Sequence, residues 1–380
     1  MTALLLGVGA TTGALLPGAI PHAGAEPQFP APPANGEMGF VVVAFSPAVN
    51  QGKDDCPLGQ AGTVRENYLQ SLPAPERERL LRKANEPELT ERWKAYATGP
   101  NLTNICSNPE LFDRPMQKIL QGTVAPGLDL DGGKKSDTCQ HENFTGLDGT
   151  SGVDNQTYRA LGCTRNWRGI DGKAGDIVWG YNNALATGEH TQVLLLRGVQ
   201  NLKDDDSVEV IWSNSDDRPV LDTKRKFITG ASFTISENPR WRNALKGHIH
   251  NGVLTTEPQD IHLTHRLGHG GIRGQRSEWD LKRGRLRLTF QADGSLDGLA
   301  GAYIPPRMMI DSAILGGIGA ATVAGIDCAA EITTLNRLAD GIKDPKTGKC
   351  TAASAAMTVT AVSAFVNDRP KLARPGKAAR

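Results

Sequence analysis

The 380-residue sequence lacks a charge excess of either sign and is poor in aromatic residues. Its 42 Lys and Arg are balanced by 41 Asp and Glu, so the formal net charge is +1 and there is no large positive field to collect nucleic-acid phosphates. Aromatic residues make up 5% of the chain, whereas Gly (43) and Pro (23) are abundant. This abundance of turn formers favours a turn-rich β architecture over a helical bundle.

Long apolar runs are also scarce. The stretch from Ala313 to Gly325 is too short and too rich in glycine to span a bilayer. At the N-terminus, a short apolar run from Leu4 to Leu16 leads to Ala23-Gly24-Ala25, a small-residue cleavage pattern. We therefore predict a signal peptide over residues 1–25 and a mature protein that is periplasmic or secreted and does not span the membrane.

The cysteines support export independently, because their number is even and none is spaced as in a zinc ribbon or a thioredoxin motif. They are Cys56, Cys106, Cys139, Cys163, Cys328 and Cys350. Six cysteines allow about 15 connectivities. Pairing of sequence neighbours is the favoured prediction, with each bridge contributing roughly 3 to 4 kcal/mol in the chain-entropy model.

Composition divides the mature chain into four regions. Residues 26–121 combine a buried strand at 40–45 with a helical, disulfide-tied segment whose apolar spacing predicts helix over 76–97. Residues 122–175 are rich in Gly and Asp and hold too few apolar residues for a core of their own, so a disulfide or a bound ion would order them. Residues 176–366 form a β domain, and 367–380 form a basic, disordered tail.

Short strand-like runs recur in the β domain, separated by turn clusters. They cover 193–197, 207–213, 227–235, 248–255, 285–291, 296–303 and 357–366, with a helix at 329–338. The run from Arg285 to Phe290 alternates polar and apolar residues, as a strand with one solvated face does. The pattern predicts a mainly β fold: an antiparallel sandwich or jelly-roll-like domain, with the small helical N-terminal segment and disulfides.

Acidic residues among glycines form the strongest local pattern. Calcium needs about six to eight oxygen ligands on a chain that turns tightly, and Asp with Gly supplies both. The calcium candidates are Asp129, Asp131, Asp137, Asp148, Asp154 and Asn155. Asp-Gly pairs also form ordinary turns, and the complete EF-hand spacing is absent, so a purely structural role is the alternative.

Histidines form a second constellation between positions 248 and 269. His248 and His250 would share one face of a strand, because strand side chains alternate. His262 and His265, or His269, could return on a neighbouring strand to complete a transition-metal site.

Signatures of common hydrolases and of phosphate-binding loops are absent. A glycan-active hydrolase would need two facing carboxylates. Glu278 and Asp280, which flank Trp279, are the candidates for that reaction.

Three segments carry a resemblance to known proteins: Gly152-Val-Asp154-Asn155-Gln, Leu161-Gly-Cys163 and the run from Asp340 to Cys350. Over roughly residues 122 to 366 the chain resembles a group of uncharacterised exported bacterial proteins. The resemblance implies export and disulfides and assigns no catalytic residue.

Together these patterns favour an exported, non-enzymatic binding or accessory protein, stabilised by calcium, whose ligand or protein partner the sequence does not identify. The alternatives are a periplasmic enzyme that uses a transition metal at the His cluster, and a glycan-active β-sandwich hydrolase. A nucleic-acid partner is not expected.

Overall fold

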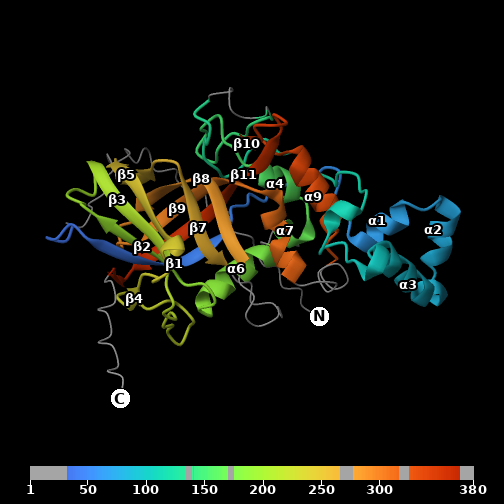
Figure 1. The fold of residues 1–380 in the computed structure, drawn as a ribbon, viewed down its shortest axis with the longest axis horizontal. Coiled ribbons are helices and arrows are strands. Elements are labelled where there is room, and N and C mark those ends of the chain that lie inside the picture. Colours follow the sequence, from blue (N-terminus) through green and yellow to red (C-terminus); the bar gives the residue numbers. More distant parts are fainter. Residues whose placement is uncertain are drawn as a thin grey trace, which may run out of the picture.

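In the computed structural model of this protein, eight strands close into an antiparallel barrel (Figure 1). The structure describes residues 32–133, 139, 141–169, 175–265, 277–315 and 325–368. Seven of the eight strands pair with the next barrel strand along the chain, and the last pairs with the first. The barrel strands are Met38–Pro47 (β1), Gln192–Arg197 (β2), Asp205–Asn214 (β3), Arg242–His250 (β5), Val253–Thr256 (β6), Ser277–Phe290 (β8), Leu296–Ile304 (β9) and Cys350–Ser363 (β11).

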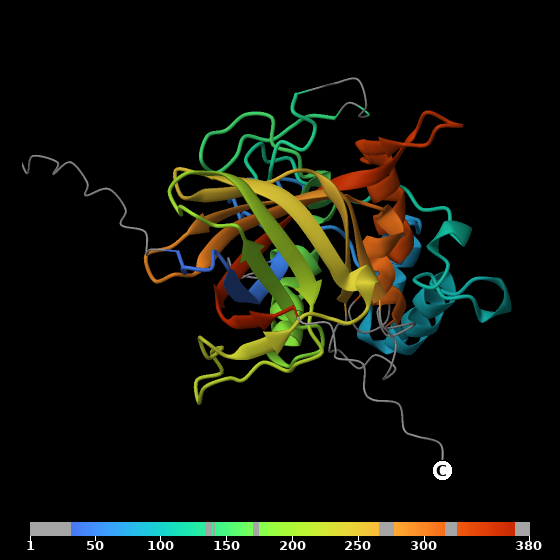
Figure 2. The same cartoon turned by 60° about the vertical axis from the view of Figure 1, so that its left-hand side comes forward.

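The predicted sandwich or jelly roll is therefore wrong. Barrel closure depends on β1, where Phe40 pairs with Ser363 and Pro47 pairs with Met357 of β11. β1 lies in the predicted N-terminal region, more than 300 residues from β11 along the chain, and the local alternation of polar and apolar residues is the same in a barrel and a sandwich. Figure 2 shows the strands curving around a common axis.

Two further strands extend the barrel wall, and two form a separate small sheet. Gln259–His265 (β7) pairs with the first half of β8, and Gly341–Lys343 (β10) pairs with the start of β11. Ser232–Thr234 (β4) and Phe365–Asn367 (β12) form a parallel pair that packs outside the barrel, against an apolar cluster containing Val41 and Ile211.

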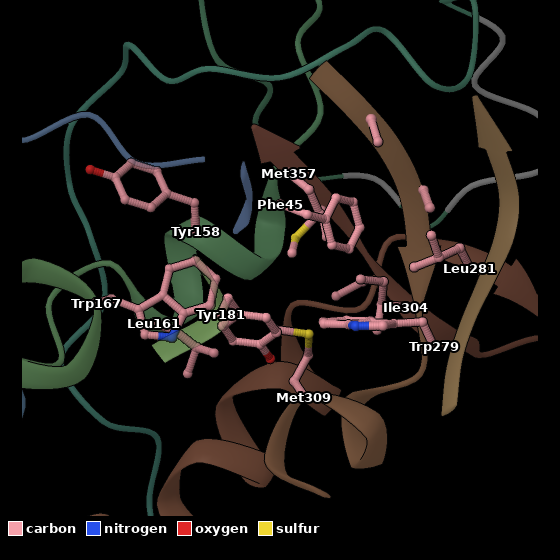
Figure 3. Packing of buried hydrophobic residues seen from close by; sticks show 14 of the residues in the cluster. Phe45, Tyr158, Leu161, Trp167, Tyr181, Trp279, Leu281, Ile304, Met309 and Met357 are labelled. Carbon is pink, nitrogen blue, oxygen red and sulfur yellow. The ribbon is translucent and has the colours of Figure 1, made fainter. Parts of the chain in front are cut away.

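Aromatic side chains fill one end of the barrel interior. Phe45 of β1 packs edge-on against Trp212 of β3 and Trp279 of β8, with ring centroids 5.5 and 6.1 Å apart. Tyr181 and Met309 point toward Trp279 from two helices that cover this end (Figure 3). Apolar residues of β8 such as Leu286 and Leu288 face inward, whereas Arg285 and Arg287 of the same strand do not join this core.

Helices occur in two insertions between barrel strands. The first insertion, between β1 and β2, holds Val64–Gln70 (α1), Ala74–Leu80 (α2), Glu86–Tyr96 (α3), Gln156–Leu161 (α4), Arg165–Arg168 (α5) and Asp176–Ala186 (α6). The second, between β9 and β11, holds Pro306–Leu315 (α7) and Cys328–Arg337 (α9). α2 and α3 confirm the helix prediction for 76–97, and Figure 1 shows α1 to α3 projecting away from the barrel.

All six cysteines form disulfides, but the predicted pairing of sequence neighbours is wrong. The bridges are Cys56–Cys163, Cys106–Cys328 and Cys139–Cys350. They close separations of 107, 222 and 211 residues, because each tied segment packs against a distant part of the chain rather than against itself. Loops of this size are worth about 5 kcal/mol each in the chain-entropy model.

The first part of the predicted Gly/Asp-rich region, residues 122–155, lies with its described residues against the outer face of the barrel. Its described residues form isolated bridges rather than named strands, such as Leu128 to Asp154 and Phe144 to Val153. Leu128 and Leu130 form a small buried cluster with Tyr303 of β9 and Ala352 of β11. The Cys139–Cys350 bridge also fastens this segment to the first residue of β11.

Candidate metal centre

Three of the predicted calcium ligands converge at this segment. Asp129, Asp131 and Asp154 each offer a carboxylate oxygen, and these oxygens lie within 4.8 Å of one another. Asp154 is 4% exposed, whereas Asp129 and Asp131 reach the surface. Among the residues that the structure describes, this is the only group of three or more acidic, His or Cys side chains that converges so closely. We call it the acidic cluster.

Backbone hydrogen bonds orient the three carboxylates. Asp154 accepts from the amide of Leu130 at 2.8 Å, and Asp129 and Asp131 accept from Gly132 and Gly133 at 2.7 Å. Both glycines have a positive φ, +66° and +67°, which suits glycine where the chain turns back on its own side chains. A carboxylate has about four lone-pair sites, so one such bond fixes its direction and leaves capacity to coordinate a cation.

The electrostatics of the acidic cluster favour a cation. Burial, reinforced by the charges of Asp131 and Asp129, raises the pKa of Asp154 to about 6. The nearby guanidinium of Arg285 donates to the carbonyl oxygens of Asp129 and Leu130, at 3.1 and 2.9 Å. Within the described residues, neither Asp129 nor Asp154 has a salt bridge to a basic side chain.

Two of the remaining calcium candidates make other contacts. Asp148 accepts from the amide of Thr150 and lies 3.5 Å from Arg287 on the surface. Asn155 uses its side chain to cap α4, accepting from Tyr158 and donating to Pro126. Asp137 falls outside the described residues.

The histidines do not gather into a metal site within the described residues. His248 and His250 are both exposed on β5, on one face as predicted, and His250 lies 3.0 Å from Asp204. His262 lies on β7, apart from this pair along the barrel wall. The side chain of His265 and all of His269 fall outside the described residues.

His262 instead joins the two candidate glycosidase carboxylates. Its Nδ1 lies 2.9 Å from Glu278 and 3.4 Å from Asp280, across the β7–β8 pair. Arg240 binds Glu278, and Lys282 lies 3.0 Å from Asp280, so each carboxylate already has a cationic partner. Glu278 and Asp280 are two positions apart on one strand and so lie side by side. This arrangement is an ion-pair network on a strand surface rather than two carboxylates facing each other across a cleft.

Two buried residues beside the acidic cluster are not among the predicted ligands. Tyr303 is 1% exposed and Asp340 is 5% exposed. Burial raises the pKa of Asp340 to about 7, and the charge of Asp154 adds to that shift. Neither residue has a local signal of its own, because they approach the cluster only through the pairing of β9, β10 and β11.

A small pocket lies away from the cluster, where α1, α5 and α9 begin. Its lining includes Thr63, Gln117, Arg165, Asp327 and Glu331. Burial, with a contribution from the charge of Asp327, raises the pKa of Glu331 to about 8. The raised pKa favours the protonated form of Glu331 in the folded protein.

The fold and the cluster define a disulfide-bonded, eight-stranded antiparallel barrel whose outer wall carries an acidic site. No family model, curated protein or solved structure matches the chain. In the described part of the chain, no helix has the length and apolar character that crossing a membrane requires.

Proposed function

We propose that this protein is an exported binding or accessory protein in which Asp129, Asp131 and Asp154 bind one calcium ion. The ion would hold residues 122–155 against the barrel and so stabilise the outer surface of β9 and β11. The observation that carries the proposal is the convergence of three carboxylate oxygens, one of them from the buried Asp154.

The donor set favours calcium over other biological cations. Calcium takes carboxylate oxygens in an adaptable shell of about six to eight ligands, completed by water, whereas magnesium requires a near-ideal octahedron. Zinc and copper prefer imidazole or thiolate, and the acidic cluster is built from aspartates alone. A cation would also offset the charges of Asp131 and Asp129, which add to the rise that burial causes in the pKa of Asp154.

Export is supported by the covalent structure. Three disulfides that use every cysteine are typical of proteins that fold in an oxidising compartment. The expected signal peptide lies outside the described residues, so cleavage after Ala25 stays a prediction that N-terminal sequencing of the exported protein can test.

The packed barrel interior supports a binding role for the outer surface. Large side chains such as Phe45, Trp212 and Trp279 occupy the interior, where other barrels hold a ligand. A ligand or protein partner would therefore bind to the outer wall or to the loops that the ion orders.

Thermal denaturation tests the calcium site. We expect calcium at about 100 times its Kd to stabilise the wild type by about 2.7 kcal/mol relative to chelator. Asp154→Asn should abolish the response, because the amide keeps the shape and the bond from Leu130 but loses the charge. Asp148→Asn is the matched control and should respond like the wild type. Equal melting curves of the wild type with calcium and with chelator would refute the proposal.

A further inference from the structure

Tyr303 presents a buried hydroxyl to the same site. The side chain is 1% exposed, and its hydroxyl has no hydrogen-bond partner among the described residues. A buried hydroxyl without a partner is costly, so its presence calls for an explanation. The residue belongs to the small apolar cluster with Leu130, whose amide holds Asp154.

The ring of Tyr303 is held in place from the other side. A Cβ on Gly341 would lie 2.1 Å from the ring, so glycine alone allows this close contact. The preceding residue, Asp340, accepts from the amide of Ser354 at 2.6 Å, and Ser354 is the cross-strand partner of Tyr303. Asp340 and the Tyr303 ring are thus fixed beside each other by β10 and β11.

The electrostatics agree with this placement. Burial and then the charges of Asp154, Asp340 and Asp131 raise the pKa of Tyr303 above its ordinary value. A tyrosine hydroxyl is neutral near pH 7, so its oxygen can coordinate a cation while its proton remains available to a carboxylate.

We propose that the Tyr303 hydroxyl is the barrel-side oxygen donor of the cation site. This inference rests on the proposed calcium site and adds a ligand from the barrel wall to the three carboxylates of residues 122–155. The ion would join the 122–155 segment, through Asp129, Asp131 and Asp154, directly to β9 of the barrel. The Cys139–Cys350 bridge fastens the same segment to β11, so the two links act together.

Terbium, a luminescent calcium analogue, separates the two claims in the full-length protein. Direct excitation of the ion reports binding, whereas excitation of tyrosine reports how close that ring lies to the ion. We expect Tyr303→Phe to bind terbium about tenfold more weakly than wild type and to lose most of the tyrosine-sensitised emission. The control is Tyr96→Phe, in α3 of the projecting helices, which should behave like the wild type.

Stability in chelator guards against a folding artefact. Because Tyr303→Phe removes a hydroxyl without a described partner, its melting temperature without the ion should equal or exceed that of the wild type. Its melting temperature with calcium should be lower than that of the wild type. If terbium binds with equal affinity and equal sensitised emission in wild type and Tyr303→Phe, Tyr303 is not a ligand of the ion. The proposed site at the three carboxylates is not contradicted by that result. Absence of terbium binding to the wild type would overturn both.

Discussion

The side-chain amide of Asn243 pairs with the backbone of His262 as a neighbouring strand would. It donates to the His262 carbonyl oxygen and accepts from the His262 amide, both at 2.9 Å. Asn214 does the same with Thr264, accepting at 2.7 Å and donating at 3.4 Å. The two asparagine side chains thus connect β3 and β5 to β7, although β7 has no backbone pairing with either strand in the described sheet.

We predict that Asn243→Ala destabilises the protein by about 3 kcal/mol, because it leaves a backbone donor and an acceptor of the barrel wall unpaired. Urea denaturation in excess calcium measures the change. Asn50→Ala, which removes one long surface hydrogen bond to Val124, is the control and should cost less than about 1 kcal/mol. A similar loss in both variants would show that the Asn243 pairing adds nothing specific.

Glu331 should make stability fall as the pH rises. Its folded-state pKa is raised from 4.5 to about 8, so the folded protein binds the proton more firmly than the unfolded chain. The resulting stabilisation is largest below about pH 4.5 and is lost progressively up to about pH 8. In chelator, Glu331→Gln should match the wild type near pH 5 and exceed its stability near pH 9. Parallel stability curves for the two proteins would contradict the raised pKa.

Removing the Cys139–Cys350 bridge should weaken calcium binding. The double variant Cys139→Ser/Cys350→Ser frees the segment that carries Asp129 and Asp131, so the ion must order it during binding. We expect a loss of about tenfold in calcium affinity by calorimetric titration, together with a lower melting temperature. The matched control, Cys106→Ser/Cys328→Ser, opens a loop of similar length, 222 residues, away from the cluster. It should lower stability without changing the affinity.

Local patterns predict much of the strand content but not the barrel. The alternation from Arg285 to Phe290 correctly marks the second half of β8, and the run at 193–197 matches β2. The predicted strand at 248–255 instead spans the turn at Asn251, where a positive φ separates β5 from β6. Closure through β1 and β11 is a pairing of distant segments, which no local pattern encodes.

The candidate site shows the same division. Asp129 and Asp131 are two positions apart among glycines, so the sequence brings them together. Asp154 reaches them through the β-bridge between Leu128 and Asp154. The Asp-Gly composition of the segment indicates a cation site but does not specify this bridge. Tyr303 lies almost 150 residues further along the chain and reaches the cluster through barrel packing alone. The predicted cysteine pairing is wrong for the same reason, because each disulfide joins segments that are distant in sequence.

Calcium stoichiometry tests the central claim most directly. Equilibrium dialysis of the disulfide-bonded protein against calcium, followed by elemental analysis, should find one ion per chain in the wild type and in Asp148→Asn. Asp154→Asn should retain none at the same free calcium concentration. Absence of bound calcium in the wild type, or an undiminished ion in Asp154→Asn, would contradict the account.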